Sequence, residues 1–157
     1  MGKHTRPSIS HYPYSSTFSV RWSDNDRYGH LNNAIYFQFY DALINGYMME
    51  HCGWHPDGNG SDSDGQIGLV VSTGTEYYEI VRGFPGPLTL GLGVKKLGKS
   101  SVEYEIGVFQ DDLQKAKAVG RFVHVFVDKK TDKTSPNGMA PSIREGLSRL
   151  VLDKAKL

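Results

Sequence analysis

One short polar segment concentrates the side chains that can carry chemistry. Asp24, Asp26 and His30 precede two amides, Asn32 and Asn33, and an apolar helical pattern begins directly after them. A carboxylate in such a place can activate a water molecule or attack a carbonyl carbon. The first N–H groups of a helix lack intrahelical acceptors, and the helix dipole makes that end positive. The segment therefore predicts a site where a carboxylate meets donors for an oxyanion.

The helix after this segment is apolar on more than one side. Apolar residues recur at the spacing i, i+3, i+4, i+7, i+11 and i+12: Tyr36, Phe39, Tyr40, Leu43, Tyr47 and Met48. Other apolar residues between them extend over most of the circumference, which predicts a buried helix. Asn32 or Asn33 is a suitable N-cap, and Gly53 is a suitable end.

The rest of the chain has mainly β-strand patterns. Phe18, Val20 and Trp22 alternate with polar residues and predict a half-buried strand. We expect a long or bulged strand over 67–82, further strands over 88–97, 102–109 and 119–127, and a terminal helix opened by a capping box at Ser142–Glu145. The prediction is one α+β domain, residues 12–157, in which a curved antiparallel sheet of about five strands wraps around a central helix. Residues 1–11 are expected to form a flexible arm.

Composition narrows the classes of protein and of partner. The 157 residues have a formal net charge of +1 and 38% hydrophobic residues, which fits one globular domain. The balanced charge argues against nucleic acid and anionic membranes as partners, and no apolar run approaches the ~20 residues of a membrane span. The single cysteine, Cys52, fits a reducing compartment, so we expect a cytoplasmic protein. The acid-free, Ser- and Tyr-rich residues 1–21 leave a mitochondrial location open.

The polar segment also carries a resemblance to a known family. Residues 21–36 follow the pattern Asp-x-Asp-x-x-Gly-His-x-Asn-Asn-x-x-Tyr, which resembles that of hotdog-fold thioesterases of the 4-hydroxybenzoyl-CoA thioesterase-like branch. The resemblance covers about Phe18 to Val127. It implies a hotdog fold, acyl-CoA as substrate, Asp26 as the catalytic carboxylate and the amide of Asn33 as the carbonyl-binding donor. The same motif is similar to one half of acyl-carrier-protein thioesterases, so the carrier stays open.

Each residue of the motif also has a plainer interpretation. Asp26 can be a turn or N-cap aspartate, and Asp24 is expected to be a turn former. His30 can fix the turn, Asn32 can cap the helix, and Tyr36 can be a core residue. The functional alternative for these three is contact with the substrate.

The densest basic segment is a predicted hairpin near residue 98. The resemblance places the family's nucleotide-contacting region there, and charged side chains on a loop can bind the phosphates of CoA. The residues expected to contact CoA or the pantetheine arm are Lys95, Lys96, Lys99, Ser100 and Ser101. The alternative is an ordinary solvated hairpin.

The resemblance implies an acyl-CoA thioesterase with no cofactor and no metal. We expect a homodimer or homotetramer with sites shared between chains, because a lone hotdog sheet leaves an edge open. An acyl-carrier-protein thioesterase, a dehydratase of the same fold and a non-catalytic acyl-binding module are the alternatives. The His and acid spacings of the dehydratases are not found in this sequence.

Overall fold

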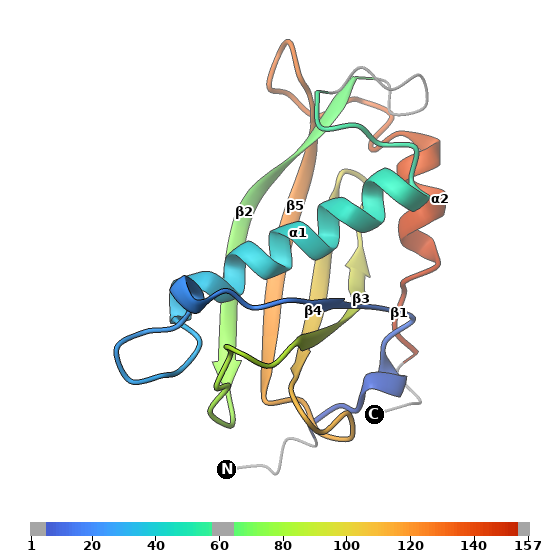
Figure 1. Ribbon diagram of the computed structural model, residues 1–157. Coiled ribbons are helices and arrows are strands. Elements are labelled where there is room, and N and C mark those ends of the chain that lie inside the picture. The colour runs from blue at the N-terminus through green and yellow to red at the C-terminus, as the bar shows by residue number, and fades with distance from the viewer. Residues whose placement is uncertain (1–5, 58–64, 154–157) are drawn as a thin grey trace.

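The computed structural model describes residues 6–57 and 65–153. Five antiparallel strands form one sheet in the order β1-β3-β4-β5-β2, and the long helix α1 crosses one of its faces (Figure 1). The elements are β1 (Tyr14–Phe18), α1 (Asn33–His51), β2 (Gln66–Tyr77), β3 (Leu88–Leu97), β4 (Ser101–Phe109), β5 (Ala118–Asp128), α2 (Pro141–Ser148) and two 3-10 turns, η1 (Ile9–His11) and η2 (Trp22–Asp24). The predicted α+β architecture is confirmed. Within the described residues, no helix combines the length and hydropathy needed to cross a membrane.

Local signals set the ends of α1 where the sequence predicts them. The side chain of Asn32 accepts a hydrogen bond from the N–H of Ala34 at 3.0 Å, so Asn32 is the N-cap. Cys52 caps the other end, and Gly53 then adopts a positive φ of 58°, which glycine tolerates without strain. The first turn of α1 is thereby held beside the polar segment that precedes it.

The sheet covers one side of α1. The buried side chains on that side are Tyr36, Tyr40, Leu43, Ile44, Tyr47 and Met48. Phe37 and Phe39 are only half-buried, and Gln38 and Ala42 are exposed. A single chain therefore encloses part of the helix circumference, and its remaining apolar side chains are covered less completely.

Three predicted boundaries are wrong. The first strand ends at Phe18 and does not reach Trp22, because Arg21 and Asp24 bond to each other and turn the chain into η2. The long strand β2 ends at Tyr77 rather than residue 82, although the predicted bulge is present as a register shift after Val70. The terminal helix begins at Pro141, with Ala140 as N-cap, so the predicted capping box at Ser142 does not start it.

The structure describes residues 6–11 of the expected arm, and these residues contact distant segments. Ile9 donates its N–H to the carbonyl of Leu113 at 2.8 Å, and its side chain packs beside Tyr12 and Phe109. Arg6 pairs with Glu79 at 2.6 Å. These contacts join segments far apart in sequence, so no local pattern could predict them. Residues 1–5 of the expected arm lie outside the described residues.

His124 of β5 is a buried neutral histidine. Its side chain is 2% exposed among Tyr104, Phe122 and Phe126, and Nδ1 has no hydrogen-bond partner among the described residues. Burial lowers its pKa from 6.5 to about 4, because the charged imidazolium loses hydration in the core.

This burial predicts a specific loss of stability in acid. His124 binds a proton near pH 6.5 in the unfolded chain but only near pH 4 in the folded chain. The free energy of unfolding therefore falls as the pH is lowered from 6.5 to 4. The loss assigned to this group is about 3 kcal/mol. Urea unfolding of the wild type and His124→Leu across this range checks it. An equal pH dependence in both proteins would contradict the assignment.

Candidate active site

The structure brings four of the predicted site residues to one pocket of about 490 Å³ beside the start of α1. These four are Asp26, His30, Asn33 and Tyr36. The opposite wall comes from the end of β2 and the chain after it, Tyr77, Tyr78, Glu79, Ile80 and Val81, and Leu31 completes the lining. The pocket thus joins the first turn of α1 to a segment about fifty residues later in the chain.

A tight turn holds Asp26. Its N–H donates to the carbonyl of His30 at 2.7 Å, and its Oδ1 accepts from the N–H groups of Tyr28 and His30 at 2.8 and 3.1 Å. Gly29 takes a φ of +74° that closes the turn. Oδ2 of Asp26 receives no hydrogen bond from any residue in the described part of the chain. One carboxylate oxygen is therefore committed to the turn, and the other remains available for chemistry.

Asp24 has a different environment, although it lies two positions away. Its carboxylate is 2% exposed and receives hydrogen bonds from the backbone N–H and the guanidinium of Arg21, both at 2.8 Å. The hydrogen bond from Arg21 lowers the pKa of Asp24. Its carbonyl accepts the N–H of Asn32 at 2.9 Å. These contacts support the structural role expected for Asp24.

The first N–H groups of α1 complete the arrangement. The side chain and the carbonyl of Asn32 accept from the N–H groups of Ala34 and Ile35. The N–H of Asn33 has no acceptor among the described residues, and Asn33 lines the pocket. An N–H in this position points out of the positive end of the helix. A carbonyl bound between Asn33 and Asp26 meets a donor for its oxygen and a carboxylate for its carbon.

The other motif residues divide between the two interpretations. Asn32 is exposed, caps the helix and does not line the pocket, which supports its role as a cap. His30 lines the pocket and also fixes the turn through its backbone. Tyr36 lines the pocket with a ring that is 3% exposed, so it is both a core residue and a wall. Burial raises the pKa of its hydroxyl, with further contributions from Tyr77 and Asp26, so the hydroxyl remains a donor.

The predicted CoA-contacting hairpin lies at the other end of the sheet within one chain. Residue Phe18, shortly before the site, pairs with Leu88 at the start of β3, whereas the hairpin follows the end of that ten-residue strand, about 30 Å away. The carbonyl of Lys99 accepts the N–H of Met139 at 2.9 Å. The carbonyl of Ser100 accepts the N–H of Phe126 at 2.7 Å. Lys96 is exposed and Ser101 is half-buried, so one chain does not bring these residues to Asp26.

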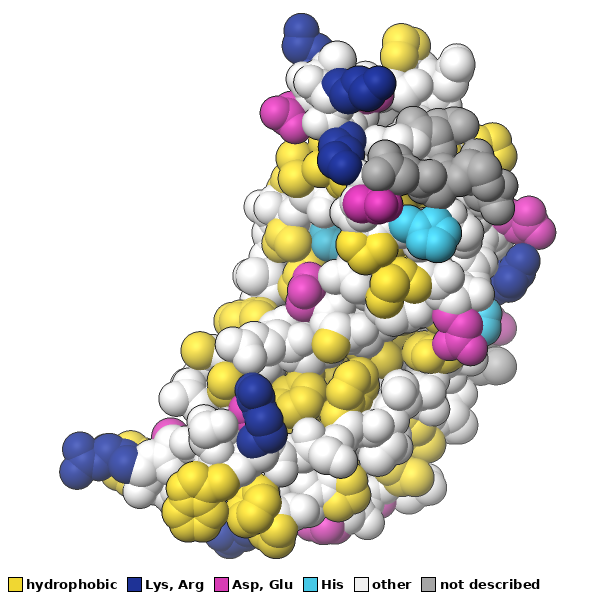
Figure 2. Space-filling view, turned by 45° about the horizontal axis from the view of Figure 1, so that its top comes forward, with side chains coloured by type: hydrophobic (Ala, Val, Ile, Leu, Met, Phe, Trp, Pro, Cys, Tyr) yellow, Lys and Arg dark blue, Asp and Glu magenta, His cyan; other side chains and the backbone are white. Residues whose placement is uncertain are grey.

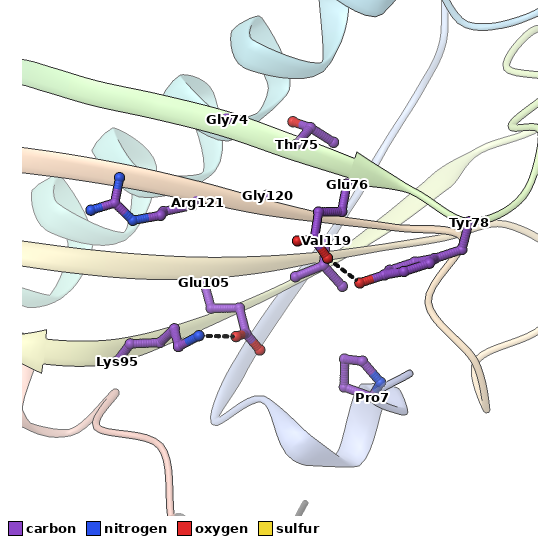
Figure 3. Close-up of a pocket in the computed structure, with 10 residues that line it drawn as sticks. All are labelled: Pro7, Gly74, Thr75, Glu76, Tyr78, Lys95, Glu105, Val119, Gly120 and Arg121. Atoms are coloured by element: carbon purple, nitrogen blue, oxygen red, sulfur yellow. Dashed lines mark hydrogen bonds and ion pairs between the residues drawn. The ribbon is translucent and has the colours of Figure 1, made fainter. Parts of the chain in front are cut away.

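Lys95 borders a second cavity, on the face of the sheet that points away from α1 (Figure 3). This cavity of about 430 Å³ lies over Gly74. Nζ of Lys95 pairs with Oε2 of Glu105 at 3.3 Å, and the hydroxyl of Tyr78 donates to Oε2 of Glu76 at 2.5 Å. Lys95 is therefore already paired with a carboxylate, whereas the predicted CoA contact requires its ammonium group to bind a phosphate.

The chain around Asp26 projects beyond the edge strand β2 (Figure 1). The projection is at the lower left of Figure 2, with a basic side chain at its tip and hydrophobic side chains beside it. Trp22 and Tyr28 in this segment are 80% and 74% exposed. Exposed large aromatic side chains are typical of surfaces that bind a partner.

Sequence reasoning missed the wall formed by residues 77–81. The run from Tyr77 to Val81 is rich in apolar and aromatic residues, and this is the one signal that could have pointed to it. The sequence does not show that the strand stops at Tyr77 and that the chain then passes the start of α1. Leu31 makes that contact by donating its N–H to the carbonyl of Val81 at 2.9 Å.

A long helix laid across a five-stranded antiparallel sheet in this order defines the hotdog fold. The site, a carboxylate that shares a pocket with the first residue of that helix, is suited to attack on a carbonyl. Residues 20–147 match the family model of the thioesterase-like superfamily, and the chain belongs to this family. Family membership supports thioester hydrolysis as its reaction.

Solved structures are similar over most of the chain. PA5185 from Pseudomonas aeruginosa has 38% identity and a TM-score of 0.84, over 94% of this chain and 98% of that one. Slr0204 from Synechocystis, a 1,4-dihydroxy-2-naphthoyl-CoA thioesterase, has 10% identity and a TM-score of 0.72, over 86% and 95%. SAV2348 from Staphylococcus aureus, solved in complex with CoA, has 11% identity and a TM-score of 0.74, over 96% and 87%. No curated protein matches the sequence.

Proposed function

We propose that this protein is an acyl-CoA thioesterase, which hydrolyses the thioester to a carboxylic acid and free CoA. The observation that carries the proposal is the shared pocket of Asp26 and Asn33, with Oδ2 of the first and the N–H of the second both without partners among the described residues. Carbonyl attack needs this pair: a nucleophile or base on the carbon and a donor on the oxygen.

Two routes use the same geometry. Oδ2 of Asp26 attacks the thioester carbon, forming a mixed anhydride that water then cleaves, or Asp26 takes a proton from a water molecule that attacks instead. In both routes the carbonyl oxygen becomes an oxyanion held by the N–H of Asn33, and the C–S bond breaks. The sulfur leaves as a thiolate, whose conjugate acid has a pKa of about 8.5, so no protein acid is required for its departure.

CoA is proposed as the carrier for two reasons. Slr0204 acts on a CoA thioester and SAV2348 binds CoA, and both share the fold. The exposed Lys96 and Lys99 supply positive charge, which suits the phosphates of CoA.

A homodimer would bring those lysines to the site. The edge strand β2 is open, and its residues Leu69, Val70 and Val71 are 40%, 48% and 59% exposed. If two copies pair these edges antiparallel, the start of β2 in one copy lies beside its end in the other. The hairpin of one chain then lies at the same end of the joined sheet as Asp26 of its partner. This arrangement would reconcile the hairpin with a CoA-binding role.

Release of free thiol from a panel of acyl-CoA and acyl-carrier substrates tests the proposal. We expect turnover of acyl-CoA with formation of the free acid. Faster turnover of acyl carriers would assign the alternative carrier, and an enoyl product would indicate a dehydratase. Saturable binding without turnover would identify a non-catalytic acyl-binding module. Analytical sedimentation in the same buffer measures the oligomeric state. An active monomer at micromolar concentration would contradict a site shared between two chains.

A further inference from the structure

Tyrosine rings close the inner end of the Asp26 pocket. Tyr36 is 3% exposed and packs edge-on against Tyr77 of β2, with ring centroids 5.1 Å apart. Tyr40, one turn further along α1, is completely buried and lies edge-on to Tyr36 at 6.4 Å. A group that enters past Asp26 therefore meets Tyr36 first and Tyr40 behind it.

Tyr40 is fixed across the space between α1 and the sheet. Its hydroxyl oxygen accepts a hydrogen bond from Oγ1 of Thr75 on β2 at 3.2 Å. Its ring lies directly on Gly120 of β5, where an added Cβ would be 2.4 Å from a ring carbon. In the described part of the chain, these contacts fill the space between α1 and β5 behind Tyr36, as the close packing of protein interiors requires.

The opposite end of the pocket is its mouth. Tyr78 and Ile80 are 37% and 56% exposed, so the pocket is open there and closed at Tyr36. The rings of Tyr36 and Tyr77 also offer edge and face contacts to another aromatic ring.

We infer that the pocket accepts a compact acyl group, a short aliphatic chain or a single aromatic ring, and excludes long fatty acyl chains. Tyr36 is the residue that sets this limit. The inference rests on the proposed thioesterase function, because it concerns the acyl group held in the same site.

The test compares kcat/KM for butyryl-, benzoyl-, decanoyl- and palmitoyl-CoA. The wild type is expected to favour butyryl- or benzoyl-CoA over palmitoyl-CoA by at least about tenfold. Tyr36→Leu removes the ring and is expected to raise the decanoyl-to-butyryl ratio by about tenfold. Tyr36→Phe retains the ring and should leave that ratio unchanged, which separates the shape of the pocket from the hydroxyl.

A wild-type preference for palmitoyl-CoA, or an unchanged ratio in a folded Tyr36→Leu, overturns the inference. If Tyr36→Leu does not fold, the wild-type profile decides alone. If no thioester is hydrolysed, the proposed function fails, and calorimetric binding of S-butyl-CoA and S-decyl-CoA still tests the length limit. Tighter binding of the decyl thioether by the wild type would then overturn it.

Discussion

Asp26→Asn lowers kcat for acyl-CoA hydrolysis by roughly a hundredfold to ten-thousandfold, the usual contribution of a positioned carboxylate. The amide has no basic oxygen that can take a proton from water and is a poor nucleophile. It keeps an oxygen to accept the N–H groups of Tyr28 and His30, which Oδ1 accepts in the wild type. The turn and the melting temperature are therefore expected to be preserved. Thiol release under saturating substrate measures kcat, and thermal unfolding followed by circular dichroism checks the fold.

Asp24→Asn is the matched control, because it makes the same chemical change two positions earlier. Asp24 is buried and bonded to Arg21 through both of its carboxylate oxygens, so its replacement should lower the free energy of unfolding by about 1–3 kcal/mol. The two variants thus separate chemistry from structure: the first loses activity and the second loses stability. Near-wild-type hydrolysis by a folded Asp26→Asn would rule out Asp26 as the catalytic carboxylate.

Local sequence identifies the wall of the pocket that contains Asp26 and Asn33. Asp26 and Asn33 lie seven positions apart, and the turn between them is built from contacts within residues 24–35. The start of α1 is equally local, because Asn32 caps it with its own side chain. The geometry of so short a segment follows from residue type and spacing. A family motif of the same length therefore predicts this geometry without knowledge of the rest of the fold.

The other half of the pocket depends on contacts between distant segments. The wall from Tyr77 to Val81 is set by where β2 leaves the sheet, which the bulge after Val70 and the pairing with β5 decide. The limit at Tyr36 depends equally on Gly120, which lets the ring of Tyr40 lie on β5. Alternation of apolar residues identifies a strand, but it does not specify its register or its neighbours. The sequence therefore predicts which residues of the polar segment line the pocket better than it predicts the shape of the pocket.

The proposed homodimer leads to the second large expected effect, which is recovery of activity in mixed dimers. One chain carries Asp26→Asn with an intact hairpin, and the other carries Lys96→Glu and Lys99→Glu with an intact Asp26. The charge reversal removes contacts to phosphate worth about 1.5 kcal/mol each or more, so KM should rise at least about tenfold. Each homodimer is then defective at both of its sites, for different reasons.

A mixed dimer pairs the intact Asp26 of one chain with the intact hairpin of the other. Random assembly of equal amounts should restore about a quarter of the wild-type sites, because half of the dimers are mixed and each has one intact site. Activity at subsaturating acyl-CoA, measured before and after the two purified proteins are exchanged, reports the recovery. The control for charge reversal is Lys115→Glu, which changes an exposed lysine between β4 and β5. This variant replaces the hairpin variant in the experiment, and its KM before mixing should equal that of the wild type. If each site used the hairpin of its own chain, mixing would restore nothing, since every chain would still carry its own defect.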